Sequence, residues 1–170
     1  KIWSAACSSG QEPYSLGMLI EEFKERHRFV KSLEITATDL SSKILEKAKL
    51  GQYDYLSIGR GLSQERLNKF FTSTCQKQWT IKPAIRRYIQ FQPINLLDSY
   101  ANLGRFDIIF CRNVLIYFTK ETKSDILRRM HQCLNPGGFL CLGSSEGLGD
   151  VSSLFTMVNC NPGLIYQAKE

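Results

Sequence analysis

A short turn and two acidic residues near the start of the chain have the residue types of a ligand-binding site. The run Cys7-Ser-Ser-Gly10 follows an apolar segment, and a turn that leads into a helix presents backbone N–H groups able to hold a carboxylate or phosphate. Glu12 either favours the positive end of that helix or faces a ligand ammonium. Asp39 either accepts hydrogen bonds from ribose hydroxyls or caps the following helix. Together these residues suit a nucleoside joined to an amino acid.

A second group of polar residues lies in the other half of the chain. Asn95 is placed to bond an adenine edge and Leu96 to pack on its face, although an Asn in a turn is often only a turn residue. Arg112, Asn113 and Tyr117 follow a strongly apolar segment directly. Because ligands bind beyond the carboxyl ends of parallel strands, these three residues place hydrogen-bond donors where chemistry would occur.

The elements that must position these residues alternate along the chain. Apolar patterns predict strands over 1–6, 33–38, 88–92, 106–111 and 139–142, and helices beginning near Pro13, at Ser41 or Ser42, and at Thr119 with apolar residues as far as Leu134. The segments 155–159 and 164–168 read as a hairpin turning at 160–163. We therefore expect a doubly wound α/β sheet with one reversed strand.

One segment interrupts the alternation. Within residues 52–87 the sequence predicts a single helix, 63–71, and we interpret this segment as an insertion. From Arg60 to Tyr88 there are seven Lys and Arg residues and one Glu, a net charge of +6 that equals the formal charge of the whole chain. Such a basic face either steers an acidic partner or is an ordinary solvated surface. The interleaved aromatic pattern of nucleic-acid binding is missing, so a nucleic-acid partner is not expected.

Composition bounds the class of protein. With 170 residues, 43% of them hydrophobic and 22% charged, the chain has the content of one globular domain with a substantial core. It contains no long apolar run and no secretory pattern at its start, so we expect a soluble, cytoplasmic protein without membrane insertion. The six cysteines have no metal-type spacing, so we expect free thiols and no metal site.

Three stretches resemble the signature stretches of the chemotaxis receptor methyltransferases (CheR). They are Ser4–Ser15, Phe106–Phe118, and Leu134–Leu140 together with Gly143-Ser-Ser-Glu146. The resemblance spans essentially the whole chain. It implies a Rossmann-like class I S-adenosylmethionine-dependent methyltransferase domain over 1–170, with a small antiparallel β-subdomain inserted over 52–87, and without the helical domain that usually precedes it.

The resemblance also implies a reaction and its residues. The family transfers a methyl group from S-adenosylmethionine to glutamate side chains of methyl-accepting chemotaxis receptors, which gives glutamate methyl esters for sensory adaptation. By matching position, the expected donor-binding residues are Ser9, Glu12, Asp39, Asn95, Leu96, Asn113 and Val114, with Arg112 and Tyr117 as catalytic residues beside the acceptor. The stretch Gly59–Ser63 resembles members that do not grip a receptor tail peptide.

Two other functions stay open at this point. The domain could be a non-catalytic module that senses S-adenosylmethionine or S-adenosylhomocysteine, or docks on a receptor, without turnover. A nicotinamide oxidoreductase is disfavoured because the turn at 7–10 has one glycine, whereas close approach to a pyrophosphate uses the G-x-G-x-x-G pattern.

Overall fold

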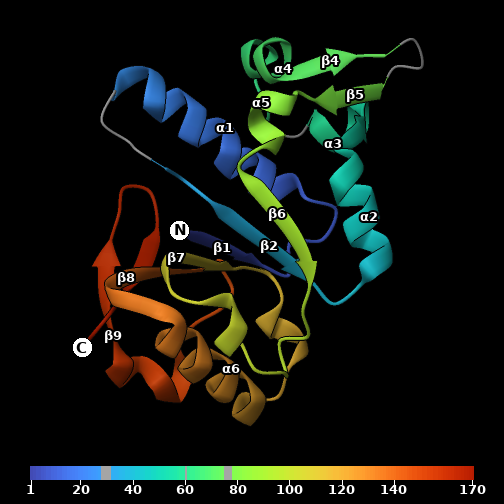
Figure 1. Cartoon of the computed structure of the whole chain (residues 1–170). Coiled ribbons are helices and arrows are strands. Elements are labelled where there is room, and N and C mark those ends of the chain that lie inside the picture. Colours follow the sequence, from blue (N-terminus) through green and yellow to red (C-terminus); the bar gives the residue numbers. More distant parts are fainter. Residues whose placement is uncertain (28–31, 60, 75–77) are drawn as a thin grey trace. The chain divides into compact units, whose positions relative to one another are not determined.

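The computed structural model describes residues 1–27, 32–59, 61–74 and 78–170, and the chain divides into two units (Figure 1). Unit 1 consists of Lys1–Ala6 and Ile94–Glu170, and unit 2 consists of Cys7–Pro93. The helices that the structure describes are all too short or too polar to cross a membrane.

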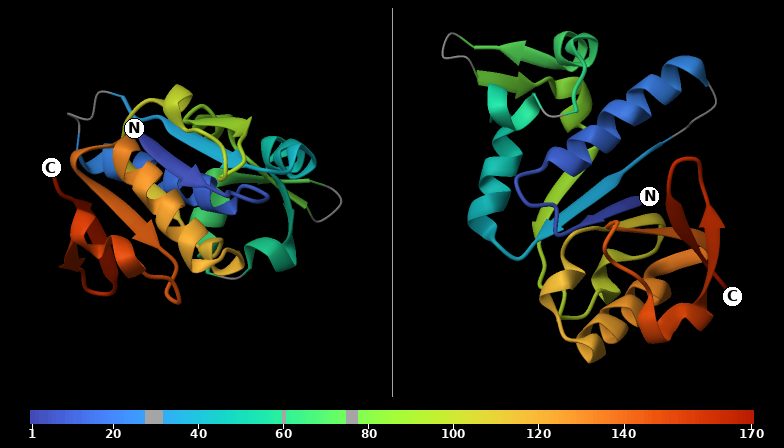
Figure 2. Two further views of the ribbon diagram at one scale, coloured as in Figure 1. Left: turned by 90° about the horizontal axis from the view of Figure 1, so that it is seen from below. Right: turned by 180° about the vertical axis from the view of Figure 1, so that it is seen from behind.

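Unit 1 is built on five strands. These are β1 (Ile2–Ala5), β7 (Phe106–Cys111), β8 (Leu134–Leu142), β9 (Phe155–Asn159) and β10 (Leu164–Ala168), in the spatial order β1-β7-β8-β10-β9. The pairs β1–β7 and β7–β8 are parallel, whereas β10 runs antiparallel to both of its neighbours. Figure 2 shows the red hairpin of β9 and β10 beside the orange β8. The predicted parallel strands, reversed last strand and closing hairpin are confirmed.

One long helix covers the core of unit 1. Helix α6 (Lys120–Cys133) begins at the predicted cap, where the Thr119 side chain accepts a hydrogen bond from Thr122 N–H. Its buried residues include Ile126, Leu127 and Met130, which join the core around Trp3. Short 3₁₀ turns, η1 (Ala101–Leu103), η2 (Leu115–Tyr117) and η3 (Gly149–Leu154), connect the larger elements.

The predicted end of this helix was wrong. Leu134 belongs to β8, where it pairs with Phe106 across an irregular register, and the strand already includes 135–138. The cause is the tertiary environment: Gly138 lies so close to the Asp107 carbonyl that an added Cβ would be 3.0 Å from it. Residues 134–138 therefore belong to β8, which pairs with β7, although their Pro and Gly residues are typical of a loop.

Unit 2 carries the parallel pair β2 (Ile35–Asp39) and β6 (Ile89–Pro93). Helix α1 (Gln11–Arg26) contacts both strands, and α2 (Ser42–Leu50) begins at Ser41, whose side chain accepts from Ile44 N–H. The predicted strand, helix and cap are confirmed. Of the apolar residues at helical spacing in α1, Ile20 is buried, whereas Leu19 and Phe23 are about half exposed.

The insertion forms a small antiparallel sheet, as expected. Strands β3 (Gln52–Asp54), β5 (Gln78–Ile81) and β4 (Phe71–Ser73) are arranged in the order β3-β5-β4. Short helices α3 (Tyr55–Ile58) and α4 (Gln64–Phe70) connect β3 to β4, and α5 (Pro83–Arg86) leads from β5 to β6. The single helix predicted for this segment, 63–71, corresponds to α4, and the sequence missed the other two. The exact limits 52–87 stay a prediction.

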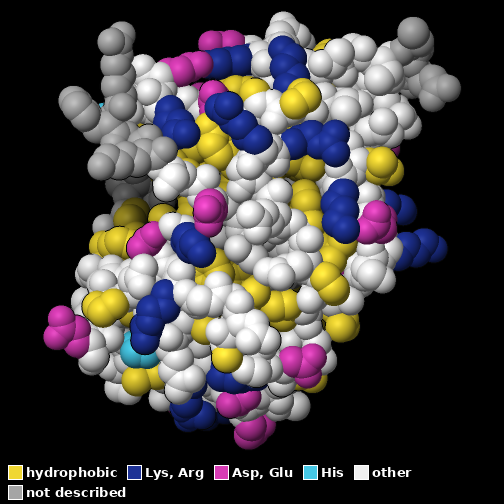
Figure 3. Space-filling model, in the orientation of Figure 1, with side chains coloured by type: hydrophobic (Ala, Val, Ile, Leu, Met, Phe, Trp, Pro, Cys, Tyr) yellow, Lys and Arg dark blue, Asp and Glu magenta, His cyan; other side chains and the backbone are white. Residues whose placement is uncertain are grey.

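Acidic residues of α1 offset much of the insertion's positive charge. Three ion pairs do this: Arg66 with Glu22, Lys69 with Glu25, and Arg87 with Glu21. Figure 3 shows Lys and Arg side chains beside Asp and Glu side chains at the top of the view, in the region of α1 and α4. Arg60 and Lys77 lie outside the described residues. The run of charge seen in the sequence is therefore not an uncompensated basic face.

Candidate functional site

In unit 2, the turn at 7–10 has an unusual backbone that a glycine and a serine make possible. Ser8 has φ 50° and Gly10 has φ 90°, both in the left-handed region. An added Cβ at Gly10 would lie 3.0 Å from the Ala48 Cβ and 3.2 Å from the Tyr53 hydroxyl. Because a left-handed backbone and close packing both disfavour a side chain there, Gly10 is needed for the turn that starts α1.

The carboxylate of Asp39 holds this turn to the end of β2. Its Oδ2 accepts from Ser8 N–H at 2.9 Å, and its Oδ1 accepts from Ser41 N–H at 3.0 Å. The structure therefore brings Asp39 together with the turn. The alternative that Asp39 caps the following helix was wrong, because Ser41 is the cap of α2 and Asp39 only accepts from the Ser41 N–H. An ionised carboxylate has about four acceptor positions, so two backbone bonds leave capacity for ribose hydroxyls.

A tyrosine of the insertion holds the backbone of Ser9 through a hydrogen bond. The Ser9 carbonyl accepts from the Tyr53 hydroxyl at 2.7 Å, and the Ser9 hydroxyl donates to Gln11 Oε1 at 2.6 Å. Burial raises the pKa of Tyr53 above its ordinary value, so this phenol remains a donor. Sequence reasoning missed Tyr53, because nothing local connects it to a turn 44 positions earlier. Glu12 lies half-buried in the first turn of α1.

Cys7 is not a nucleophile. Burial, with a smaller contribution from the negative charge of Asp39, raises the pKa of its thiol to about 12. Since the thiolate is the reactive form, this cysteine is inert at neutral pH. Its role is packing, with Ala37 and Leu45.

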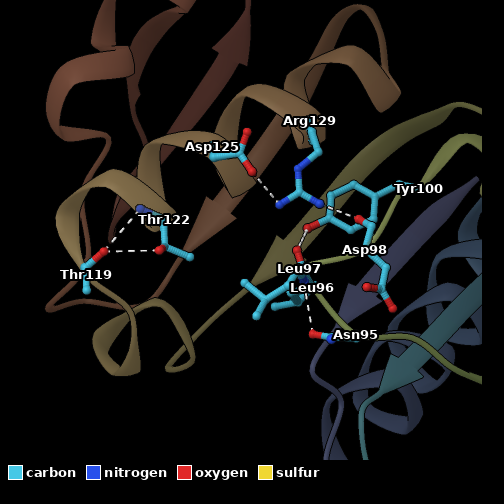
Figure 4. Close-up of polar contacts among 9 residues, drawn as sticks. All are labelled: Asn95, Leu96, Leu97, Asp98, Tyr100, Thr119, Thr122, Asp125 and Arg129. Atoms are coloured by element: carbon cyan, nitrogen blue, oxygen red, sulfur yellow. Dashed lines mark hydrogen bonds and ion pairs between the residues drawn. The ribbon is translucent and has the colours of Figure 1, made fainter.

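In unit 1, a network fixes the loop that contains Asn95 and Leu96 (Figure 4). The Tyr100 hydroxyl donates to the Leu96 carbonyl, and Arg129 from α6 reaches over the Tyr100 ring, 4.8 Å from its centroid. Asn95 Oδ1 accepts from Leu97 N–H at 3.0 Å, so the Asn95 side chain stabilises a turn, one of the two roles expected from the sequence. The Asn95 side-chain NH₂ is the group suited to an adenine acceptor. Leu96 is only 6% exposed and packs in the core.

The segment after β7 has a second strained position. Asn113 has φ 58°, and the backbone N–H groups of Asn113 and Val114 donate to the carboxylate of Glu146. The sequence placed Glu146 in a family stretch but gave it no role. An acid shortly after a predicted strand, 139–142, was the available signal.

Arg112 lies beside a cavity within unit 1. This cavity, of about 540 Å³, is lined by Arg112, by the end of β8 and by the turn of the β9–β10 hairpin. Tyr117, at the end of η2, is 79% exposed. A smaller cavity of about 130 Å³ in unit 2 lies between α1 and the insertion and is lined by none of the expected site residues.

Comparison with known proteins defines the class and then the family. The fold is that of class I methyltransferases: the chain resembles the glycopeptide N-methyltransferase MtfA with a TM-score of 0.53, at 14% identity over 83% of this chain and 44% of that chain. It resembles DhpI, solved with S-adenosylhomocysteine, with a TM-score of 0.52, at 12% identity over 99% of this chain and 59% of that one.

Residues 1–164 match the family described as "CheR methyltransferase, SAM binding domain", and the chain belongs to that family. S-adenosylmethionine is therefore its cofactor. The chain is 55% identical to chemotaxis protein methyltransferase 1 of Pseudomonas aeruginosa and 54% identical to chemotaxis protein methyltransferase Cher2 of Pseudomonas putida, over 99% of its length. It spans 62% of the length of each of these relatives.

Proposed function

We propose that the full-length protein transfers a methyl group from S-adenosylmethionine to glutamate side chains of methyl-accepting chemotaxis receptors in the cytoplasm. The glutamate methyl esters would serve sensory adaptation, and the acceptors would be acidic cytoplasmic receptor helices. The observation that carries the proposal is the 55% identity, over 99% of this chain, to a protein named for chemotaxis methylation.

The residues of unit 2 suit one part of the donor. In the strained turn at 7–10, the N–H groups of Cys7, Ser8 and Gly10 already donate to acceptors within the protein. Ser9 would therefore bind the donor carboxylate, through its backbone N–H and its hydroxyl. Glu12 offers a carboxylate to the ammonium group. Asp39, with acceptor capacity left after its two backbone bonds, suits the ribose hydroxyls. This set of groups fits an amino acid joined to a nucleoside.

The residues of unit 1 suit the adenine and the acceptor. Asn95 offers a side-chain NH₂ to an adenine edge, and Leu96, which is buried in the core, would hold the loop beside it. Asn113 and Val114 are held in a fixed backbone conformation next to Arg112. The cavity beside Arg112 offers room for an acidic side chain.

The chemistry requires little proton transfer. When bound, the donor supplies a methyl group on a sulfonium, which an oxygen of the acceptor carboxylate attacks in line. A glutamate has a pKa near about 4.3, so it is ionised at neutral pH and needs no general base. The protein's contribution is orientation and exclusion of water. Arg112 and Tyr117 would orient the carboxylate, the first by charge and the second by a hydroxyl donor.

Methyl transfer to receptor-containing membranes tests the proposal. With labelled S-adenosylmethionine, the full-length protein is expected to form base-labile methyl esters that disappear when the receptor's acceptor Glu residues are changed to Gln. Arg112→Ala and Tyr117→Phe are expected to lower kcat while binding of S-adenosylhomocysteine is retained. Donor binding by the unaltered protein without any ester would instead identify a sensing or docking module.

A further inference from the structure

The Glu146 carboxylate binds the segment that follows β7 through its whole acceptor capacity. Its Oε2 accepts from Asn113 N–H and Gly143 N–H, each at 2.8 Å. Its Oε1 accepts from Val114 N–H at 3.0 Å and from Leu115 N–H at 2.7 Å. Because a carboxylate has about four acceptor positions, these four bonds leave none for a ligand. Glu146 therefore acts through the backbone that it holds.

The segment that Glu146 holds cannot be fixed by regular structure. Strand β7 ends at Cys111 and η2 begins at Leu115, so Asn113 and Val114 lie between the two elements, and their N–H groups donate to Glu146. Asn113 also has a left-handed backbone, φ 58°, which Asn tolerates better than most residues but which still costs free energy relative to a right-handed backbone. The Glu146 carboxylate accepts hydrogen bonds from the N–H groups of this segment, and these bonds also hold Asn113 in its left-handed conformation.

Close packing of β8 against this segment makes the arrangement specific. Gly143, which follows β8, is buried, and an added Cβ there would lie 2.5 Å from Asn113 Oδ1 and 2.6 Å from Glu146 Oε2. The ends of the adjacent parallel strands β7 and β8 are thus joined by one carboxylate, and a side chain at 143 would force Asn113 and Glu146 to move.

We propose that Glu146 is a positioning residue for methyl transfer, an inference that rests on the proposed function. Its carboxylate fixes the backbone of Asn113 and Val114 before the donor binds, and it sets the direction in which Arg112 and Tyr117 leave this segment toward the acceptor. Preorganisation of this kind removes an ordering cost from donor binding.

Glu146→Gln in the full-length protein tests this role. The amide has the same shape, but its NH₂ faces two backbone N–H groups whichever way it is turned. Calorimetry with S-adenosylhomocysteine is expected to show a dissociation constant raised at least about tenfold, with a full number of binding sites. Asp150→Asn, which removes an exposed carboxylate paired with Lys120, is the matched control and is expected to leave binding unchanged.

Two further measurements separate positioning from general stability. If Glu146 acts through Asn113, Glu146→Gln must cause a smaller loss of affinity for S-adenosylhomocysteine when Asn113→Ala is already present. In the unaltered protein, the amides of Asn113, Val114 and Leu115 are expected to exchange as slowly as those of β7.

Three results would overturn the inference: fewer binding sites with an unchanged dissociation constant, full additivity of the two substitutions, or rapid exchange of these amides. Failure of the proposed function looks different, because the unaltered protein would then bind the product normally but form no ester. The exchange measurement needs no variant. It therefore tests whether Glu146 holds the backbone of this segment even where a substitution prevents folding.

Discussion

Gly143→Ala is the substitution whose effect the structure defines most closely. The new Cβ would lie 2.5 Å from Asn113 Oδ1 and 2.6 Å from Glu146 Oε2, whereas real Cβ atoms essentially never approach other atoms within 3.0 Å. The neighbours must therefore move apart by about 0.5 Å, which takes the 2.8 Å bonds of Glu146 to Gly143 and Asn113 toward the outer limit of hydrogen bonding.

The expected cost follows from those two bonds. Hydrogen bonds to a charged group contribute about 1.5–3 kcal/mol each, and partial loss of two of them gives a destabilisation of about 2–4 kcal/mol. For a domain of this size, that lowers Tm by roughly 4–16 °C. Because Asn113 and Val114 are expected to bind the donor, affinity for S-adenosylhomocysteine should also fall, by about tenfold or more.

Gly147→Ala is the matched control, since an added Cβ there has nothing within 4 Å. Both variants are measured in the full-length protein by thermal unfolding and by calorimetry with S-adenosylhomocysteine. The reasoning is refuted if Gly143→Ala is indistinguishable from Gly147→Ala in both assays. It is also refuted if Gly143→Ala loses stability but keeps the donor affinity of the unaltered protein.

Three other substitutions test unit 2. Asp39→Asn should weaken binding of S-adenosylhomocysteine by about tenfold, because one acceptor oxygen becomes a donor; calorimetry with unaltered affinity would exclude a ribose role. Burial raises the pKa of the Cys7 thiol to about 12. The contribution of the buried thiol to the free energy of unfolding is therefore fully present below pH 9, and it falls above pH 9 by up to about 1.4 kcal/mol per pH unit. Urea unfolding of Cys7→Ala between pH 8 and 10 should therefore show a shallower decline than the unaltered protein, and equal slopes would contradict it. The hydrogen bond from Arg66 lowers the pKa of Glu22, so Glu22→Gln should destabilise the protein by at most about 1 kcal/mol at pH 7. That difference should shrink as the pH falls below about 4.3, the ordinary pKa of a glutamate, and a difference that does not shrink in acid would argue against the ion pair.

Much of the local architecture follows from the sequence, because it depends on contacts a few residues apart. The caps at Ser41 and Thr119 bond to N–H groups three positions later, and such side-chain to backbone bonds are visible as residue types at fixed spacing. The apolar runs of β1 and β7 and the turn before β10 are equally local signals.

The sequence by itself thus determined the order of strands and helices outside the insertion, the caps at Ser41 and Thr119, and the family. Only the tertiary structure decided that Leu134 belongs to a strand, that α1 offsets part of the insertion's positive charge, and that Tyr53 supports the turn at Ser9. Above all, it decided that Glu146 binds the backbone of a segment more than 30 positions earlier. The physical reason is that such bonds depend on strand register and on the space between side chains, neither of which is contained in the spacing of residues along the chain.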